Sequence, residues 1–436
     1  MKKPLISLSL SALAFVSHGA FAQTQSNTLD AALKKSEPNV IEWRRHIHQN
    51  PELGNREFET AKYITQHLKA LGIEVETGIA HTGVVGFLKG GKPGPTLALR
   101  ADMDALPVTE QVDIPFASKA TTQYNGEEVG VMHACGHDTH VAMLMGAAEV
   151  LAGMRDELAG NILFIFQPAE EGAPDGEEGG AELMLKEGLF KKYKPAVAFG
   201  QHVTSSLPSG VIGYRSGPLM ASSDQFKIHV HGRQTHGSRP WGGVDPITAS
   251  AQIVMGTQTL VSRQIDITKE PAVVSFGIID GGVRNNIIPD SVYMNGTIRN
   301  FDMDNRQEIF KRLKVTAEKI AEASGAEAKV EILEGYPVTV NNPALTEEAI
   351  PALKAAAGDD KVMVIPKITG AEDFSFFANE IPGFYYFLGV TPKGTDPSTA
   401  ASNHSPQFYV DEGALKIGTK AITQLAIDYL DRQKNQ

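Results

Sequence analysis

The chain has 436 residues, of which 42% are hydrophobic and 21% are charged, so it can form one large or two ordinary domains and is neither disordered nor collagen-like. Its formal net charge is −11 and no Lys- or Arg-rich block stands out, which argues against nucleic acid or an anionic membrane surface as the main partner. A protein that acts on small molecules fits this composition better.

The first 22 residues have the features of a secretory signal peptide. Lys2 and Lys3 precede an apolar run over residues 5–16, and residues 20–22 (Ala-Phe-Ala) supply the small residues of a signal-peptidase site. The apolar run is shorter than the ~20 residues that a membrane-spanning helix needs, and no later stretch reaches that length, so we expect no membrane insertion. We expect export to the periplasm or the medium after cleavage near Ala22.

The next part of the chain alternates helical and strand patterns of apolar residues. Helices are predicted at residues 40–49, 58–71 and 142–151, and strands at 84–88, 96–101, 161–166 and 196–200. Strands that alternate with helices indicate a mostly parallel sheet covered on both faces. Ligands of such sheets bind beyond the carboxyl ends of the strands.

The order of the predicted helices and strands changes near residue 217. The predicted elements are strand, helix, strand, strand, helix and strand, at residues 226–231, 245–263, 272–279, 292–298, 305–323 and 328–333. This β-α-β-β-α-β order is typical of a ferredoxin-like unit, and we expect a turn at Gly281 and Gly282 between its second and third strands. Helix and strand alternation then returns, with strands at 362–365 and 384–390.

We therefore predict an α/β fold in which a mostly parallel-sheet catalytic domain is interrupted by an inserted ferredoxin-like domain. After the signal peptide (1–22), the catalytic domain occupies residues 23–216 and 335–436, and the insert occupies residues 217–334.

The densest polar cluster is the run H-A-C-G-H-D-T-H at residues 133–140, directly before the helix at 142–151. Cys135 is the only cysteine, so it cannot form an internal disulfide, and in an exported protein it needs either burial or a chemical role. Cys135 and His137 stand two residues apart, which lets a bent backbone turn a thiolate and an imidazole toward one point, while Asp138 can orient a ring. A capped helix start with a buried thiol is the alternative.

Polar residues also follow the carboxyl ends of two predicted strands. Glu170 and Glu171 come after the strand at 161–166, where adjacent carboxylates are costly unless a cation neutralises them. One can bind a metal while the other acts as a base, although a solvated acidic loop is the simpler interpretation. His202 follows the strand at 196–200, and His404 lies near the C-terminus.

The start of the helix at 142–151 and the carboxyl ends of these two strands are expected to meet at the same edge of the sheet. The candidate ligands are Cys135, His137, Glu171, His202 and His404. The set is large enough for two divalent ions that share one ligand. Thiolate and imidazole favour zinc, whereas the carboxylate also allows manganese, cobalt or nickel.

Several motifs together resemble the amidohydrolase branch of the binuclear aminoacylase and carboxypeptidase family, which includes hydrolases of hippurate, N-acyl amino acids and indole-acetyl amino acids. The motifs are R-A-D-M-D-A-L-P at 100–107, H-A-C-G-H-D-T-H at 133–140, Q-P-A-E-E-G at 167–172, G-V-D-P-I at 243–247, N-I-I-P-D at 286–290 and G-A-E-D-F at 370–374. The similarity runs in order from His46 to about Gly418. It implies a catalytic domain with an inserted lid or dimerisation domain.

The resemblance also implies roles for the metal-site residues. Cys135 matches a bridging thiolate that replaces an Asp used in other branches, and Glu170 matches the general base. His137, Glu171, His202 and His404 match the remaining ligands. Asp102 and Asp104 stand where other branches have H-x-D, and we expect them to support the ligands rather than to bind metal.

Three further residues are expected to contact the substrate. His236, in a loop of the insert, resembles the residue that reaches into a neighbouring subunit and stabilises the oxyanion, which implies a homodimer formed through the insert. Arg299 is a candidate clamp for the substrate carboxylate, although a surface salt bridge is the alternative. Asn286 belongs to the N-I-I-P-D motif. Here Asn285 and Asn286 replace the single Asn that is common in the family.

The function that these features predict is metal-dependent hydrolysis of the amide bond of N-acyl amino acids with an aromatic or aliphatic acyl group. A metallo-carboxypeptidase or a dipeptidase is the nearest alternative, with a short peptide as the substrate. An exported solute-binding protein with a structural metal would share the size and acidity, but it would have no need for Glu170 beside Glu171.

Overall fold

The computed structural model describes residues 11–434 and divides the chain into two compact units. Of the described residues, the first unit comprises 11–213, 348–363 and 385–434, and the second comprises Tyr214–Glu347 and Val364–Phe384. The predicted insert at 217–334 lies within the second unit. That unit also takes in residues 335–347 and 364–384, which the sequence had assigned to the catalytic domain.

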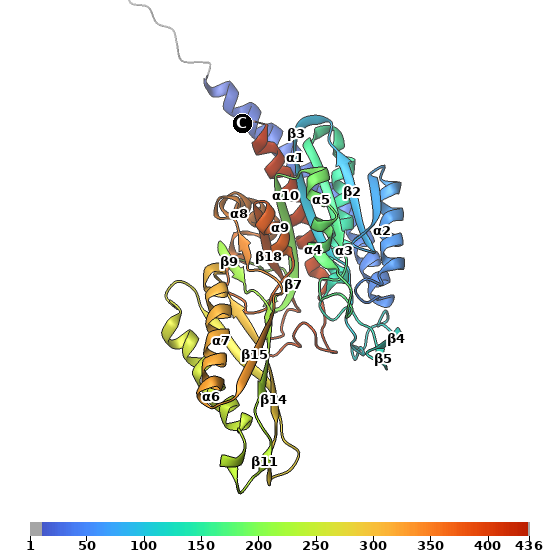
Figure 1. Cartoon of the computed structure of the whole chain (residues 1–436). Helices are drawn as coiled ribbons and strands as arrows, with labels where there is room; N and C mark the ends of the chain where they lie inside the picture. Colours follow the sequence, from blue (N-terminus) through green and yellow to red (C-terminus); the bar gives the residue numbers. More distant parts are fainter. Residues whose placement is uncertain (1–10, 435–436) are drawn as a thin grey trace, which may run out of the picture. The chain divides into compact units, whose positions relative to one another are not determined.

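The first unit is built on an eight-stranded sheet of the described residues, in the order β1-β2-β6-β3-β7-β18-β8-β17 (Figure 1). The strands are β1 (Glu74–Ile79), β2 (Gly83–Lys89), β3 (Lys92–Asp102), β6 (Ala159–Gln167), β7 (Val197–Pro208), β8 (Ile212–Tyr214), β17 (Val362–Val364) and β18 (Gly383–Thr391). The central strands β6, β3 and β7 run parallel, whereas the pairs β1–β2, β2–β6 and β18–β8 are antiparallel. The α/β class is confirmed, with the parallel part at the centre of a mixed sheet.

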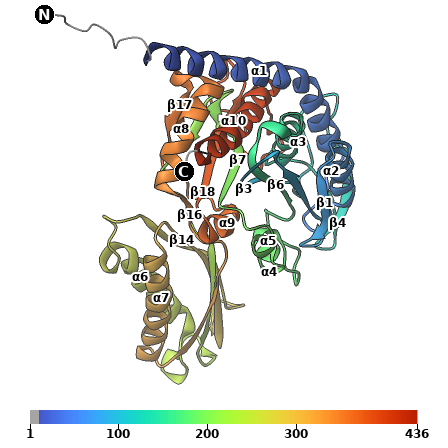
Figure 2. The ribbon, with the colours of Figure 1, turned by 90° about the horizontal axis from the view of Figure 1, so that it is seen from above.

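Helices cover both faces of this sheet. They are α1 (Ser11–Gln49), α2 (Phe58–Ala70), α3 (His137–Gly153), α4 (Gly180–Lys186), α5 (Leu189–Tyr193), α8 (Pro343–Ala357) and α10 (Leu415–Gln433). Helices α3 and α10 pack on the central strands, and α1 runs across both of them (Figure 2). On β2, Gly86 faces Leu68 of α2, while the ring of the next residue, Phe87, lies 5.5 Å from that of Tyr193 in α5. Because successive strand residues point to opposite faces, α2 and α5 lie on opposite sides of the sheet.

Two boundaries near the polar motifs differ from the sequence prediction. Strand β7 continues to Pro208, so His202 lies within the strand rather than after it. Helix α3 begins at His137, so His137 and Asp138 belong to its first turn instead of preceding it. In both places buried polar side chains interrupt the apolar pattern from which the boundaries were predicted.

The second unit has the predicted β-α-β-β-α-β order. Its elements are β10 (Asp224–His231), α6 (Pro246–Thr259), β12 (Ala272–Asp280), β14 (Ser291–Asn300), α7 (Met303–Ala323) and β15 (Glu327–Leu333). They form an antiparallel sheet in the order β12-β14-β10-β15, and α6 and α7 pack together against it. Shorter elements of this unit are β9 (Gly217–Met220), β11 (Thr235–His236), β13 (Ile287–Ile288), β16 (Thr339–Asn341) and α9 (Phe374–Glu380).

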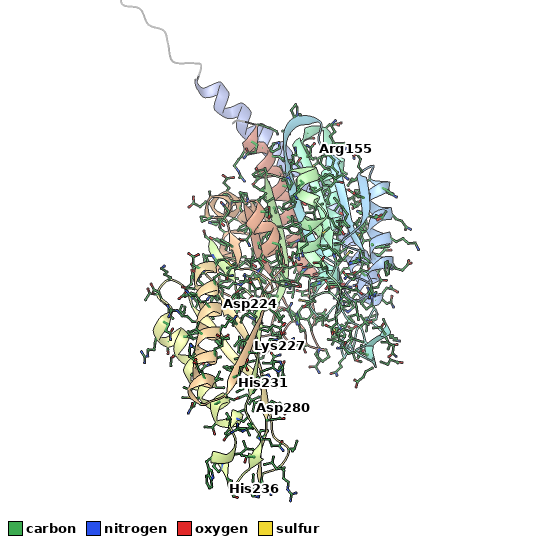
Figure 3. All side chains as sticks on the ribbon, viewed as in Figure 1. Arg155, Asp224, Lys227, His231, His236 and Asp280 are labelled. Carbon is green, nitrogen blue, oxygen red and sulfur yellow. The ribbon has the colours of Figure 1, made fainter. Side chains whose placement is uncertain are left out.

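The connection between β12 and β14 is longer than the predicted turn. Gly281 and Gly282 begin a loop that reaches Asp290 and contains the short strand β13, which pairs with β11. At the other end of the sheet, buried Asp224 accepts hydrogen bonds from Arg306 at 2.6 and 3.0 Å, which ties β10 to α7. Figure 3 shows Asp224 and His236 at opposite ends of this unit.

The predicted signal peptide falls partly outside the described residues, because residues 1–10 are not among them. From Ser11 the backbone is helical and continues through the expected cleavage position into the rest of α1. Within residues 11–434, no helix has both the length and the apolar character that crossing a membrane requires.

Candidate active site

The five predicted metal ligands converge in the first unit. The Cys135 sulfur lies 3.3 Å from His202 Nε2 and 3.2 Å from His404 Nε2. His404 Nε2 also lies 3.0 Å from Glu171 Oε1. Residues far apart in the chain therefore present a thiol, imidazoles and a carboxylate to one another.

Cys135 belongs to two of the donor groups that this cluster forms. One group contains Cys135, His137 and His202, and the other contains Cys135, Glu171 and His404, with the donor atoms of each group within 4.8 Å of one another. The first group is buried, whereas the side chains of Glu171 and His404 are 17% and 54% exposed. The arrangement therefore has two neighbouring positions for a cation, and the second is the one that solvent can reach.

Three unusual backbone conformations shape this cluster. Gly136 has φ +95°, and a Cβ at this position would come within 2.4 Å of Val203, so only glycine fits between the two ligand residues. Ala169 and His404 have φ values of +51° and +71°, which is unfavourable for residues with a side chain. Such strain persists where the surrounding contacts hold it, and here it lies next to candidate ligands.

Hydrogen bonds fix the orientation of the histidine rings. His137 Nδ1 lies 2.9 Å from the carbonyl oxygen of Asp104 and 3.1 Å from its Oδ1, so this nitrogen is the donor and Nε2 is left to face the cluster. His202 Nδ1 donates to the Val203 carbonyl at 2.6 Å, which directs its Nε2 toward Cys135. Ligand histidines are commonly oriented in this way by the nitrogen that does not bind metal.

His140 is close to this cluster but serves a different purpose. Its Nε2 accepts the backbone N–H of Val203 at 2.8 Å, so in the neutral ring Nδ1 carries the proton and donates it to Asp102 Oδ1 at 2.5 Å. Asp102 Oδ2 accepts from Arg100 at 2.6 Å. Asp102 and Asp104 thus hold neighbouring side chains in place, which agrees with the supporting role expected for them.

Asn403 anchors the loop that carries His404. Its Nδ2 donates to the carbonyls of Cys135 at 3.0 Å and Val203 at 3.1 Å, and its Oδ1 accepts the N–H of Ser205 at 3.3 Å. The N–H of His404 donates to the Ala134 carbonyl at 2.8 Å. These bonds join the loop to the Cys135 turn and to β7.

Glu57 anchors the loop that carries Glu170 and Glu171. Its carboxyl group accepts the N–H of strained Ala169 at 2.9 Å and the hydroxyl of Thr82 at 2.6 Å. Burial and the nearby charge of Asp104 raise the pKa of Glu57 to about 8. The sequence contains no signal for this role, since Glu57 lies far from its partners along the chain.

The electrostatics of the cluster favour a cation. Burial and the carboxyl groups of Glu171 and Glu170 raise the pKa of the Cys135 thiol well above its usual range. Burial disfavours a charged His137 ring, yet Asp102 and Asp104 outweigh it and raise the pKa of His137 to about 10. Positive charge is thus stabilised on the ring, while a thiolate needs a positive charge beside it.

The surroundings of His137 Nε2 fit a metal ion. This buried atom has no hydrogen-bond partner in the described part of the chain. Three carboxylate oxygens surround it, from Glu170 at 3.8 Å and from Asp102 and Glu171 at 3.9 Å. These distances are too long for hydrogen bonds. Those to Glu170 and Glu171 suit atoms that each lie about 2.0–2.2 Å from a shared cation, whereas Asp102 Oδ2 already accepts from Arg100. The side chains present therefore match a divalent metal in both number and chemistry.

Asp138 does not orient a ligand, contrary to the expectation from the sequence. Its Oδ2 accepts from Arg44 Nε at 2.7 Å and lies 2.9 Å from His48 Nδ1. His48 Nε2 in turn lies 3.0 Å from Glu110. This buried network joins α1 to the first turn of α3, and Asp104 takes the role that had been assigned to Asp138.

His236 and Asn286 lie together in the second unit. The N–H of Gly237 donates to the Asn286 carbonyl at 2.8 Å, next to the pairing of β11 with β13. His236 is exposed, and its Nδ1 accepts from the backbone N–H of Ser238 at 3.1 Å. In the neutral ring the proton is therefore on Nε2, which is available as a donor.

Arg299 lies on β14 of the four-stranded sheet, near the end that is remote from His236. It is eight residues beyond Ser291 on β14, or roughly 26 Å along an extended strand, and Ser291 pairs with His231 at the end that leads to His236. Its Nη1 donates to Thr297 Oγ1 at 2.5 Å and to the Ile298 carbonyl at 3.0 Å. Within one chain, the second unit thus separates Arg299 from His236 and Asn286.

Comparison with known proteins identifies the family. Residues 98–428 match the model of peptidase family M20/M25/M40. The chain is 44% identical over 402 residues to thermostable carboxypeptidase 2 of Saccharolobus solfataricus, covering 92% of this chain and 98% of that protein. It is 38% identical over 396 residues to N-acetylcysteine deacetylase of Bacillus subtilis, covering 91% and 98%.

A solved structure resembles the chain over nearly the same extent. The YXEP protein of Bacillus subtilis, described as a dinuclear metal-binding peptidase of the M20 family, has a TM-score of 0.76 and 36% identity, covering 91% of this chain and 99% of that one. The chain therefore belongs to peptidase family M20/M25/M40 and is a metal-dependent hydrolase.

Proposed function

We propose that the protein hydrolyses the amide bond of N-acyl amino acids, releasing a carboxylic acid and a free amino acid. The observation that carries the proposal is that Cys135 belongs to two donor groups beside a pair of carboxylates. The deacetylase activity in the name of one similar protein supports the substrate class.

In this proposal, Cys135, His137 and His202 hold one divalent ion, and Cys135, Glu171 and His404 hold a second. Zinc or manganese is expected, with cobalt or nickel as further candidates. When bound, two such ions lower the pKa of water and polarise the scissile carbonyl group. Asp104 holds His137 and Glu171 in position through contacts at 3.1 and 2.9 Å, so one ligand of each donor group is fixed by the same side chain.

Glu170 is the proposed general base. Its side chain is buried and its Oε2 lies 3.8 Å from His137 Nε2, so it borders the first cation position. Its carboxylate accepts a proton from the attacking water and delivers it to the nitrogen of the departing amino acid, so that one group serves first as base and then as acid.

His236, Asn286 and Arg299 are the proposed substrate contacts of the second unit. The free Nε2–H of His236 suits a hydrogen bond to a developing oxyanion, and the guanidinium of Arg299 suits a carboxylate. Because Arg299 lies near one end of the four-stranded sheet and His236 and Asn286 lie beyond its other end, we propose that His236 serves the site of a second copy of the chain, in a homodimer formed through this unit.

The proposal is tested with a substrate panel and two controls. Metal-reconstituted enzyme is assayed on N-acetyl, N-benzoyl and indole-acetyl amino acids beside dipeptides, and we expect the N-acyl compounds to be cleaved with the higher kcat/KM. Chelation should abolish turnover and a divalent ion should restore it. Full activity of the demetallated protein, or cleavage of dipeptides alone, would reject the proposal.

The Glu170→Gln variant tests whether Glu170 is the general base or a metal ligand. The amide keeps the shape of the side chain but accepts no proton, so kcat should fall about 10²–10⁴-fold while the metal content stays unchanged. Loss of metal from this variant would instead assign Glu170 as a ligand. Glu170→Asp is the matched control, since it keeps the charge.

Export is also proposed. Cleavage after Ala22 would leave a chain that starts at Gln23 within helix α1. The burial of Cys135 is compatible with export, because a buried thiol is protected in an oxidising compartment. N-terminal sequencing of protein recovered outside the cytoplasm should find Gln23, and an intact Met1 there would contradict it.

A further inference from the structure

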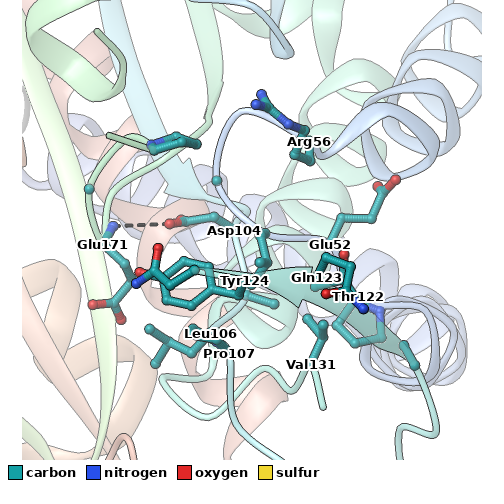
Figure 4. A pocket seen from close by; sticks show the side chains of 18 of the residues that line it. Glu52, Arg56, Asp104, Leu106, Pro107, Thr122, Gln123, Tyr124, Val131 and Glu171 are labelled. Atoms are coloured by element: carbon teal, nitrogen blue, oxygen red, sulfur yellow. Dashed lines mark hydrogen bonds between the residues drawn. The ribbon is translucent and has the colours of Figure 1, made fainter. Parts of the chain in front are cut away.

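A cavity of about 570 Å³ lies in the first unit beside Glu171 (Figure 4). Its walls come from the loop after α1, from residues 104–107, from the loop at 171–175 and from a hairpin formed by β4 (Thr121–Tyr124) and β5 (Glu127–Gly130). Neither the family motifs nor the metal cluster assigns a role to this hairpin.

The cavity adjoins the solvent-accessible half of the metal cluster. Asp104 and Glu171 line it and are joined by the hydrogen bond from the Glu171 N–H to Asp104 Oδ2, drawn in Figure 4. Cys135, His137 and His202 are buried, whereas Glu171 is partly exposed. A molecule in the cavity would therefore lie next to a ligand of the more open cation position.

The charges around the cavity disfavour the amino-acid half of the substrate. Four acidic residues line it, namely Glu52, Asp104, Glu171 and Asp175. Among the described residues, the one basic residue that lines it is Arg56, whose guanidinium pairs with Glu177 at 2.5 Å. An α-carboxylate placed there would face like charges.

The same carboxylates do not form a receptor for a free amine. Glu52 accepts the backbone N–H groups of Glu59 at 3.2 Å and Thr60 at 2.9 Å in the first turn of α2, and Asp104 holds His137 and the Glu171 amide. Glu171 contacts His404, and Asp175 lies at an exposed position. The side chains of Leu106, Pro107, Tyr124 and Val131 supply apolar surface (Figure 4).

We infer that this cavity is the subsite for the uncharged acyl group of the substrate and that the β4–β5 hairpin sets which acyl groups fit. The inference rests on the proposed function. It assigns to the hairpin the choice between N-acyl amino acids that differ in their acyl group.

The hairpin has a tight turn of a defined type. Asn125 and Gly126 have φ values of +52° and +83°, the two positive angles of a type I′ turn, and Tyr124 pairs with Glu127 across them. Thr122 and Tyr124 are two residues apart on β4 and therefore share a face of the strand. Both line the cavity, while Glu128 on β5 does not.

The test uses substitutions in the hairpin that change the volume of the cavity. Thr122→Trp should reduce the cavity and Tyr124→Ala should enlarge it. Glu127→Ala and Glu128→Ala, at exposed positions of β5 outside the cavity lining, are the controls. Each variant is assayed on one series with a constant amino acid, N-acetyl-, N-hexanoyl- and N-benzoyl-methionine, and on a second with a constant acyl group, N-acetyl-methionine, -phenylalanine and -glutamate.

Thr122→Trp should lower kcat/KM for the benzoyl and hexanoyl substrates relative to the acetyl substrate by about 10-fold or more, and Tyr124→Ala should shift the same ratio the other way. Ratios within the amino-acid series should stay within about twofold, as should all ratios of the controls. Unchanged acyl ratios in both variants, or a shift in the amino-acid ratios instead, would overturn the subsite.

The wild-type enzyme separates this outcome from failure of the proposed function. If it cleaves the N-acyl series and the variants leave the acyl ratios unchanged, only the subsite is rejected. If it cleaves dipeptides and no member of either series, the proposed function is rejected and the subsite with it.

Discussion

The backbone N–H of Glu171 donates to Oδ2 of Asp104 at 2.9 Å. The other oxygen of the same carboxylate lies 3.1 Å from His137 Nδ1. One side chain thus positions a member of each donor group, so we expect the two cation positions to depend on it together.

Asp104→Asn should weaken the binding of both ions by about 10–100-fold, because an amide can accept from only one of the two donors. The affinity is measured by competition with a chromophoric chelator. Asp175→Asn, an exposed change in the neighbouring loop, is the control and should keep wild-type affinity. If Asp104→Asn binds both ions as tightly as the wild type, Asp104 does not position the ligands.

The raised pKa of Glu57 predicts that the stability of the fold depends on pH. Its pKa is raised from 4.5 to about 8, so the stabilising contribution of its protonated form is complete below about pH 4.5 and is lost as the pH rises through 8. Glu57→Gln keeps acceptors and donors for Ala169 and Thr82 without this titration. The unfolding free energy of the wild type should therefore fall relative to the variant between pH 5 and pH 8, by on the order of 3–4 kcal/mol.

Thermal or denaturant unfolding at several pH values measures this difference. Glu59→Gln, an exposed change on the same helix, is the control and should run parallel to the wild type. A constant difference between the wild type and Glu57→Gln across the window would show that Glu57 is ionised in the folded protein at neutral pH.

Mixing two inactive variants tests the role of His236. If His236 completes the site of a partner subunit, His236→Ala and Glu170→Gln should regain activity when they exchange subunits, because a mixed dimer has one intact site. At equal amounts half of the dimers are mixed, so about a quarter of the wild-type activity is expected.

Differently tagged chains establish that subunits have exchanged before activity is read. With exchange shown, an inactive mixture would contradict the role across the subunit boundary. An active monomer at the assay concentration would do the same, and the metal assignment would still stand.

Local motifs predicted part of the donor cluster that the structure brings together. Cys135 and His137 share one turn and Glu170 adjoins Glu171, so their proximity is encoded within a few residues. The alternation of apolar residues likewise predicted the β-α-β-β-α-β order of the second unit. Both are short-range patterns, which periodicity and spacing can capture.

The supporting contacts could not be predicted in this way. Asp104 reaches His137, and Glu57 reaches Ala169, through tertiary packing of separate elements. The strand that contains His202 extends beyond its apolar residues because buried polar side chains continue it. The β4–β5 hairpin is mostly polar and exposed, so hydrophobic periodicity does not detect it.

X-ray absorption spectroscopy of the zinc-reconstituted enzyme tests most directly whether the Cys135 sulfur is shared by two metal ions. Cys135 is the only cysteine, so a thiolate sulfur at about 2.3 Å from zinc can come only from this residue. The account predicts two zinc ions per chain, a sulfur neighbour for each, a metal–metal distance of about 3.5–4 Å, and loss of the sulfur signal in Cys135→Ser. A spectrum with nitrogen and oxygen neighbours alone, or one that Cys135→Ser leaves unchanged, would contradict it.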